Sequence, residues 1–186
     1  MKKLGPSGMR WFRSIHLFFV TMWVGGGISI VLVYFLSSPA GGDELYASWA
    51  SMKIVDDFVI IPGAMGNLLM GLLYGAFTNW GFFKHRWLAV KWALAAAQIL
   101  FGTFCLGPWL NGNAAIAFAE RAAAPESPVF LHNQAMVAFW GVVQVAFLVV
   151  MVWISVFKPW RGRKAARGVR SSGGQGNGAA VRGGGQ

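Results

Sequence analysis

The chain has few acidic residues and almost no cysteine. Its 186 residues include 6 Asp and Glu against 16 Lys and Arg, and only 12% of all residues are charged. The single cysteine, Cys105, excludes an intramolecular disulfide, a cysteine-based zinc site and the two-cysteine attachment of a c-type haem. The three histidines have no partner at i+3 or i+4 and no paired carboxylates, so metal hydrolases and di-iron proteins lack their ligand sets.

Long apolar segments dominate instead, since 56% of the residues are hydrophobic. Each segment reaches the roughly 20 residues that a helix needs to cross the hydrocarbon of a bilayer. They cover about 15–36, 58–79, 87–110 and 130–157. We therefore predict an all-α integral membrane protein with one four-helix transmembrane domain over 1–170. The Gly- and Ser-rich tail, 171–186, has little to bury, and we expect it to be disordered.

The few charges are sorted by sign between the gaps. All six carboxylates fall between the first and second segments or between the third and fourth, whereas nearly all Lys and Arg fall in the other gaps and at the ends. Only Lys53 and Arg121 oppose this trend. The positive-inside rule then predicts that both termini are cytoplasmic. The first segment is too long for a signal peptide and lacks a convincing cleavage site, so we expect it to remain in the mature protein.

Short connections, such as 81–86, predict antiparallel neighbours in an up-down-up-down bundle. In the first acidic gap, Leu45, Trp49, Met52 and Val55 recur at helical spacing, which predicts a short helix on the outer interface, and 114–124 shows a weaker pattern of the same kind. We interpret Pro62 as a feature of a helix N-terminus rather than as a hinge.

The formal net charge of +10 raises the question of nucleic acid. The basic residues flank membrane segments and no nucleic-acid-binding motif surrounds them, so we interpret them as topology signals and contacts for anionic lipid headgroups. We predict the lipid bilayer as partner and no nucleic acid.

One face of the first helix has the residues of a binding surface. Trp23 and Gly27 follow His16 by 7 and 11 residues, which returns to nearly the same direction on a helix. With Gly26, they form a shelf on which a porphyrin edge or another helix would pack equally well. The second helix carries a similar ridge of small residues, whose structural role in helix packing we favour: Gly63, Asn67, Gly71 and Gly75.

The third helix has a polar stripe that includes Lys91 and, seven residues later, Gln98. Lys91 is the only charge well inside an apolar segment, and no carboxylate is available on its side of the membrane. Two explanations stay open: its ammonium extends to the cytoplasmic headgroups, which depth alone favours, or it pairs with an anionic ligand such as a haem propionate or a quinone oxygen.

The histidines have simple explanations as well as functional ones. His16 lies near a helix end, where one ring nitrogen would be solvated at the interface. His132 begins the fourth helix on the opposite side, so one haem could not bridge it to His16 across about 30 Å of hydrocarbon. His85, in the loop after the second helix, could reach the same region as His16, but a solvated position at the interface suits it better.

Three short segments carry a resemblance to a known superfamily. The run from His16 to Gly26 (HLFFVTMWVGG), Ile61–Met65 (IPGAM) and Trp87–Lys91 (WLAVK) resemble, in order and spacing, the membrane core of HemJ-type protoporphyrinogen oxidases and CopD-like copper-resistance proteins. The resemblance implies a bacterial cytoplasmic (inner) membrane protein that binds haem b. In HemJ proteins the corresponding His and Lys are associated with haem and activity, which implies that His16 is an axial ligand and Lys91 its partner or a substrate contact.

The chain departs from the HemJ pattern at two places. A Leu-Pro-Arg segment is missing after the first helix's glycines, and Ala89 stands where the family has His. We therefore expect the haem to be retained rather than the oxidation of protoporphyrinogen. The predicted cofactor-binding set is His16, Trp23, Gly26, Gly27, Lys91 and Gln98, with His16 on the haem iron and His85 as a secondary candidate.

Three functions follow from these expectations. The first is a small haem b protein that transfers electrons to or from a quinone or a protein partner. The second is a porphyrin or quinone oxidoreductase of HemJ type. The third is a non-redox assembly or copper-handling subunit, although the methionines form no dense cluster and suit core packing better. Because so small a bundle offers little pocket of its own, we expect a redox partner or a second copy of the chain.

Overall fold

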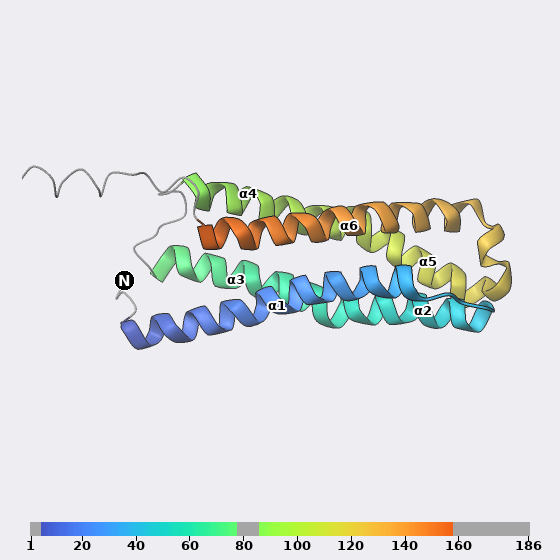
Figure 1. The fold of residues 1–186 in the computed structure, drawn as a ribbon, viewed down its shortest axis with the longest axis horizontal. Coiled ribbons are helices and arrows are strands. Elements are labelled where there is room, and N and C mark those ends of the chain that lie inside the picture. Colours follow the sequence, from blue (N-terminus) through green and yellow to red (C-terminus); the bar gives the residue numbers. More distant parts are fainter. Residues whose placement is uncertain (1–4, 78–85, 158–186) are drawn as a thin grey trace, which may run out of the picture.

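The computed structural model describes residues 5–77 and 86–157, and these are helical with short connections. Four helical segments are long and apolar enough to cross a membrane: Ser7–Leu36, Gly42–Phe77, Leu88–Glu126 and Pro128–Phe157. Figure 1 shows them side by side along the long axis of the molecule. The predicted all-helical membrane fold is confirmed at this level. The predicted tail, 171–186, and His85 lie outside the described residues.

The first and last segments are single helices, and the middle two are composite. α1 spans Pro6–Leu36 and α6 spans Pro128–Phe157. The second segment consists of α2 (Gly42–Val55), the π-helical η1 (Asp56–Ile60) and α3 (Ile61–Phe77). The third consists of α4 (Arg86–Phe101), the π-helical η2 (Gly102–Leu106), α5 (Gly107–Glu120) and the 3₁₀ turn η3 (Arg121–Glu126).

The first three helical segments extend well beyond the predicted apolar segments, whereas the fourth, Pro128–Phe157, nearly matches the predicted 130–157. At about 1.5 Å per residue, even the 30-residue segments are about 45 Å long, which exceeds a hydrocarbon core of about 30 Å. The helix expected in the first acidic gap is present as α2, but it is not a separate helix on the outer interface, because it continues directly into η1 and α3. The reason lies in its apolar side chains: Trp49 and Met52, each 2% exposed, pack into a core with residues of α1, α5 and α6.

That core is the most closely packed part of the molecule, and we call it the head core. Ala117 and Ala124 are fully buried, and Phe130 is 1% exposed. The indole of Trp49 stacks edge-on against Tyr34 and Phe130 at centroid distances of 6.3 and 5.5 Å. Asn113 is fully buried there and donates from Nδ2 to the carbonyl of Phe130 over 3.0 Å. The head core thus joins α1, α2, α5 and α6 at one end of the molecule.

Both π-helical segments end two residues before a proline. The Ile61 N–H donates to the Asp56 carbonyl, and the Gly107 N–H donates to the Gly102 carbonyl, each five residues back. Pro62 and Pro108 follow, and a proline has no N–H and its ring collides with the carbonyl four residues earlier in an α-helix. The wider π turn relieves that collision. The interpretation of Pro62 as a helix N-terminus is therefore wrong, since the proline lies inside a continuous helical segment.

The remainder of the bundle is packed unevenly. α1 lies along α3 and α6, and α4 lies along α6, whereas α3 and α4 share no comparable interface within the described residues. Later residues of α1 contact earlier residues of the second segment. Phe12 meets Tyr74, Gly26 lies against Ile60, and Tyr34 meets Trp49. Two cavities lie where α3 and the α4–α5 segment are not packed closely together, and we call this region the open seam.

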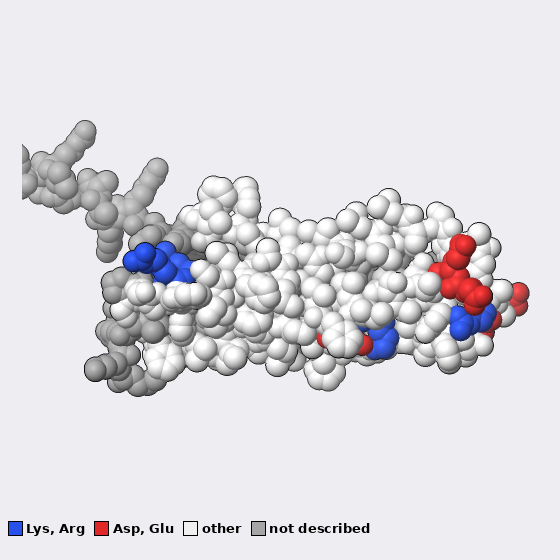
Figure 2. All heavy atoms as spheres, turned by 90° about the horizontal axis from the view of Figure 1, so that it is seen from below, with Lys and Arg blue, Asp and Glu red and all other residues white. Residues whose placement is uncertain are grey.

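The charges of the described residues are separated along the molecule. On the face in Figure 2, basic side chains gather at the end where α1 begins and most acidic ones at the opposite end. The two basic residues that oppose the trend are each paired: Lys53 Nζ lies 2.7 Å from Asp57, and Arg121 lies 3.4 Å from Asp43. Many large apolar side chains point outward between these ends, including Phe18, Leu32, Phe104 and Trp153, which suits contact with lipid.

Candidate functional site

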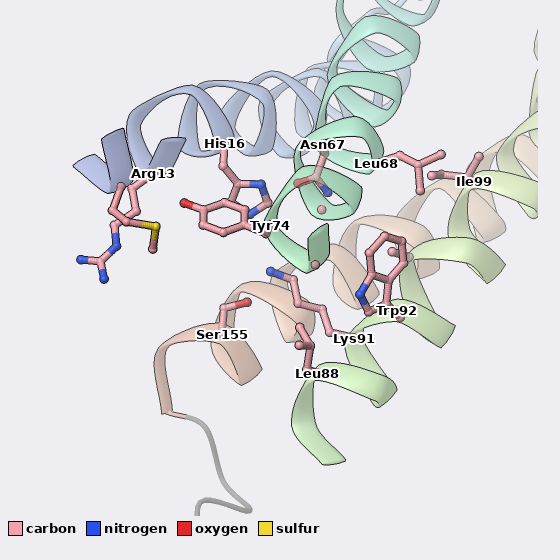
Figure 3. A pocket seen from close by; sticks show the side chains of 14 residues that line it. Arg13, His16, Asn67, Leu68, Tyr74, Leu88, Lys91, Trp92, Ile99 and Ser155 are labelled. Carbon is pink, nitrogen blue, oxygen red and sulfur yellow. The ribbon is translucent and has the colours of Figure 1, made fainter. Parts of the chain in front are cut away.

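The first cavity lies at the end of the bundle where α1 begins. Its volume is about 380 Å³, within the range of small-molecule sites. Figure 3 shows that α1, α3, α4 and α6 all contribute to its walls. Its polar lining consists of Arg13, His16, Asn67, Tyr74, Lys91 and Ser155.

His16 enters this cavity from α1. Its imidazole meets the Tyr74 ring edge-on, with centroids 5.7 Å apart and planes at 83°. Its Nδ1 is buried and has no hydrogen-bond partner among the described residues. A buried ring nitrogen without a partner costs free energy, and a ligand that used the imidazole would offset that cost. The expectation that one ring nitrogen is solvated at the interface concerns the other nitrogen, Nε2, and stays a prediction.

Two cations border the same cavity. The Lys91 ammonium points from α4 into the space below His16 and Tyr74, and Arg13 lies at the edge nearest the start of α1 (Figure 3). No described carboxylate lines the cavity, and neither cation has an ion pair within the described part of the chain. Lys91 is therefore placed to meet an anion inside the bundle, although depth alone favoured an extended conformation toward the headgroups. The site is suited to an anionic ligand.

The wall opposite His16 is made of small residues from the predicted ridge of the second segment. Gly71 and Gly75 line the cavity, and a Cβ at Gly71 would lie 3.2 Å from the indole of Trp92. Asn67 lies one turn earlier, with its Oδ1 buried and without a donor among the described residues. The absence of a side chain at Gly71 therefore makes room for the indole of Trp92. Gly63, by contrast, packs on the backbone of α1.

The residues predicted as one site fall into three places. His16 and Lys91 share the first cavity. Trp23, Gly27 and Gln98 instead line a second cavity of about 400 Å³, nearer the middle of the bundle. Gly26 lines neither, because a Cβ there would lie 2.7 Å from Ile60 and 3.2 Å from Val59. The shelf expected along one face of α1 is thus divided between two cavities and a helix contact.

Three polar residues of the first cavity were not singled out from the sequence: Arg13, Tyr74 and Ser155. Arg13 precedes His16 by three residues, so the spacing of neighbours on one helix face could have identified it. Tyr74 follows Asn67 by seven residues on the predicted ridge and offered the same kind of signal. Ser155 offered no signal in the sequence. In the structure its hydroxyl donates to the Met151 carbonyl at 2.7 Å, as many membrane serines do.

The other candidate metal ligands stay apart from this site. His132 is exposed at the opposite end of the fourth segment, and Cys105 is half-buried in η2. The described residues contain no group of three or more His, Cys, Asp and Glu that could hold a metal ion. A metal in the first cavity would consequently depend on His16 together with a ligand group that carries its own donors.

Comparison of the chain with family models, with curated proteins and with solved structures finds no match.

Proposed function

We propose that this chain is a membrane protein that binds haem b in the first cavity and exchanges electrons with a quinone or a redox partner protein. The observation that carries the proposal is the convergence on one cavity of a buried histidine nitrogen and two cations, for none of which the described residues provide a hydrogen-bond acceptor, donor or carboxylate partner. The resemblance of three segments to the HemJ and CopD superfamily points to the same cofactor.

The lining fits the parts of a haem. The imidazole of His16 would serve as an axial ligand, since a neutral histidine nitrogen is the usual donor in b-type sites. Arg13 and Lys91 would neutralise the two propionates, because hydrogen bonds between cations and carboxylates are about twice as strong as neutral ones. Gly75 adds no side chain to the cavity wall on α3. When bound, haem b supplies one-electron redox chemistry.

We place the chain in a bacterial cytoplasmic membrane as an up-down-up-down bundle with both termini in the cytoplasm. The charge separation in Figure 2 supports this orientation through the positive-inside rule. Along α1, the distance from Arg13 to Val33 is about 30 Å, one hydrocarbon thickness. Val33 packs against the head core, whose Trp49 lies one turn from the Lys53–Asp57 pair, so that pair marks the other membrane surface. The head core then projects outside the membrane.

The test is the visible spectrum of the detergent-purified protein, oxidised and reduced with dithionite, with pyridine haemochrome quantification. We expect a Soret band, sharp reduced α and β bands and about one haem per chain. The variant His16→Ala should lose most of the haem, and Lys91→Met should weaken binding less, because one charged hydrogen bond contributes about 1.5–3 kcal/mol.

His132→Ala is the matched control, since it removes an exposed imidazole at the other end of the bundle and should keep the haem. Both histidine variants must elute as folded protein on size exclusion. Full haem in His16→Ala would remove the proposed ligand. A folded wild-type protein that cannot be reconstituted with haem would favour a non-redox assembly or copper-handling subunit.

One observation supports a second function, the oxidation of a porphyrin. The HemJ pattern contains an arginine after the first helix that this chain lacks, but Arg13 brings a guanidinium to the cavity from another position. Porphyrin carboxylates would then have a partner. Formation of fluorescent protoporphyrin from protoporphyrinogen by the purified protein, and its loss in Arg13→Gln, would establish this activity. A rate equal to that without protein would remove it.

A further inference from the structure

The second cavity is separate from the proposed haem site. It has a volume of about 400 Å³ and lies between α1, the η1–α3 segment, the α4–α5 segment and α6. Most of its lining is apolar, and the indole of Trp23, 3% exposed, forms one wall. Its polar side chains include Gln98, Gln144 and Asp56. A mostly apolar cavity with a few inward polar groups is the usual form of a small-molecule site.

Two carboxamides meet at the inner wall. Gln98 is 7% exposed and donates from Nε2 to the backbone carbonyl of Gln144 over 3.0 Å. The Gln144 side chain lies beside Gly102, and its Oε1 is buried with no donor among the described residues. Leaving a carboxamide oxygen unpaired in an apolar interior is costly. A leucine at either position would pack as well, so hydrogen bonding to a ligand is the natural use of these side chains.

The cavity exists because the helices around it are distorted and lack side chains. Both π turns line it, and both are imposed by a following proline. Gly27, Gly102 and Gly141 line it as well. A Cβ at Gly141 would meet only Val31, at 4.0 Å, so this glycine leaves space in the cavity. Turns of π type occur often at functional sites, where they re-aim the neighbouring residues. Here two of them, on separate segments, widen the same space.

The rim of the cavity faces outward between α3 and the η2–α5 segment. On the α3 side, Ile61 and Met65 are 49% and 54% exposed, and on the other side Thr103 and Pro108 are exposed. These residues belong to helical segments that can cross a membrane. The opening therefore leads to lipid rather than to water, and a ligand would enter from the bilayer.

The lining restricts the chemistry of that ligand. None of the described residues around the cavity is Lys or Arg, and Asp56 disfavours an anion, so an anionic ligand is excluded. An acyl chain would leave the Gln144 carboxamide oxygen unpaired. A carboxamide can donate to a carbonyl and accept from a hydroxyl, so it can hold both the oxidised and the reduced form of a quinone. Trp23 offers a face for a flat ring.

We propose that the second cavity binds the ring of a membrane quinone, with Gln98 and Gln144 on the ring oxygens and the tail leaving between α3 and α5. This site is distinct from the first cavity, and quinone binding there does not require haem. Ile99 lines both cavities, so a quinone in one would lie next to a cofactor in the other.

The experiment measures binding of decylubiquinone and, separately, of menaquinone-2 to the detergent-purified full chain by equilibrium gel filtration. We expect saturable binding of at least one of them near one molecule per chain. Gln98→Leu and Gln144→Leu should each weaken it about tenfold or more, as expected for loss of one hydrogen bond to the ligand. Gln134→Leu, the same change on α6 away from both cavities, should leave the affinity unchanged.

Lys91→Met, which changes only the first cavity, should also leave quinone affinity unchanged, and haem content is measured in parallel so that the two proposals succeed or fail separately. Gly141→Leu gives a second approach, because it fills the cavity without removing a polar group, and it should abolish binding in a protein that elutes normally. The proposal is overturned if neither quinone binds, or if binding survives Gln98→Leu, Gln144→Leu and Gly141→Leu.

Discussion

At the scale of the residue, the glycines of α1 and α3 differ in what surrounds them. Gly25 has nothing within 4 Å of the position that a Cβ would take. Gly63, which belongs to the predicted ridge, has the backbone nitrogen of Trp23 2.7 Å from that position and the Cβ of Met22 at 3.0 Å. A side chain can move away from a new methyl group, but a helix backbone cannot move without repacking the interface.

Gly63→Ala should therefore lower the free energy of unfolding by about 1–3 kcal/mol, the usual cost of overpacking. Gly25→Ala should leave it unchanged or raise it by up to about 1 kcal/mol, because alanine has the higher helix propensity. Thermal unfolding of the two variants in the same detergent, followed by circular dichroism, measures the difference. Equal melting temperatures would contradict the close approach of α1 and α3.

At the same scale, the sequence predicted His16 and Lys91 together, and the structure places them on one cavity. Their pairing was predictable because polar residues in apolar segments turn inward. The separation of Trp23, Gly27 and Gln98 from them was not predictable. It depends on how far α3 and α4 stand apart, and this follows from the packing of the whole bundle rather than from the spacing on any one helix.

At the scale of the element, α2 shows that tertiary packing decides whether an amphipathic helix lies on a membrane surface or in a protein core. Its pattern of apolar residues predicted a helix correctly, but the same pattern suits a membrane surface and a protein core equally well. The core was available here because α5 lies beside α2 and buries apolar residues against it. The two prolines carried a signal too, but a proline alone does not distinguish a helix start from a π turn within a helix.

The contribution of α2 can be measured with two tryptophans. Trp49→Ala removes a side chain that is 2% exposed in the head core, and it should cost about 3–5 kcal/mol. Trp153→Ala removes an indole of α6 that is 66% exposed and should change stability by less than about 0.5 kcal/mol. Unfolding in mild detergent with a denaturant gradient compares them. Similar costs would mean that α2 lies on the membrane surface, as first predicted.

At the scale of the whole molecule, the number of membrane segments and their all-helical class follow from composition and length, because hydrocarbon leaves few structural alternatives. The orientation follows from charge and stays a prediction. The head core could not be predicted from the sequence. An amphipathic helix keeps one apolar face and one polar face along its length, so its sequence does not show where the membrane ends and water begins.

The orientation predicts which positions react with a membrane-impermeant maleimide. In a Cys105→Ala background, Ala123→Cys places a thiol at an exposed position of η3, and Ser7→Cys places one at an exposed position near the start of α1. Spheroplasts of cells that produce the protein should show labelling of position 123, whereas position 7 should react only after permeabilisation. The opposite pattern would invert the topology, and labelling of both before permeabilisation would exclude a fixed orientation.

The contrast between the head core and the open seam also has a kinetic meaning. Amide hydrogens in closely packed regions exchange only on global unfolding, whereas those in sparsely packed regions exchange through local opening at lower free energy. The amides around Trp49 and Phe130 would then stay protected until global unfolding. At the other end of the bundle, α3 and α4 would change their separation through local opening. A molecule held in this way can admit ligands of different width from the bilayer without disturbing the part that keeps its four helices together.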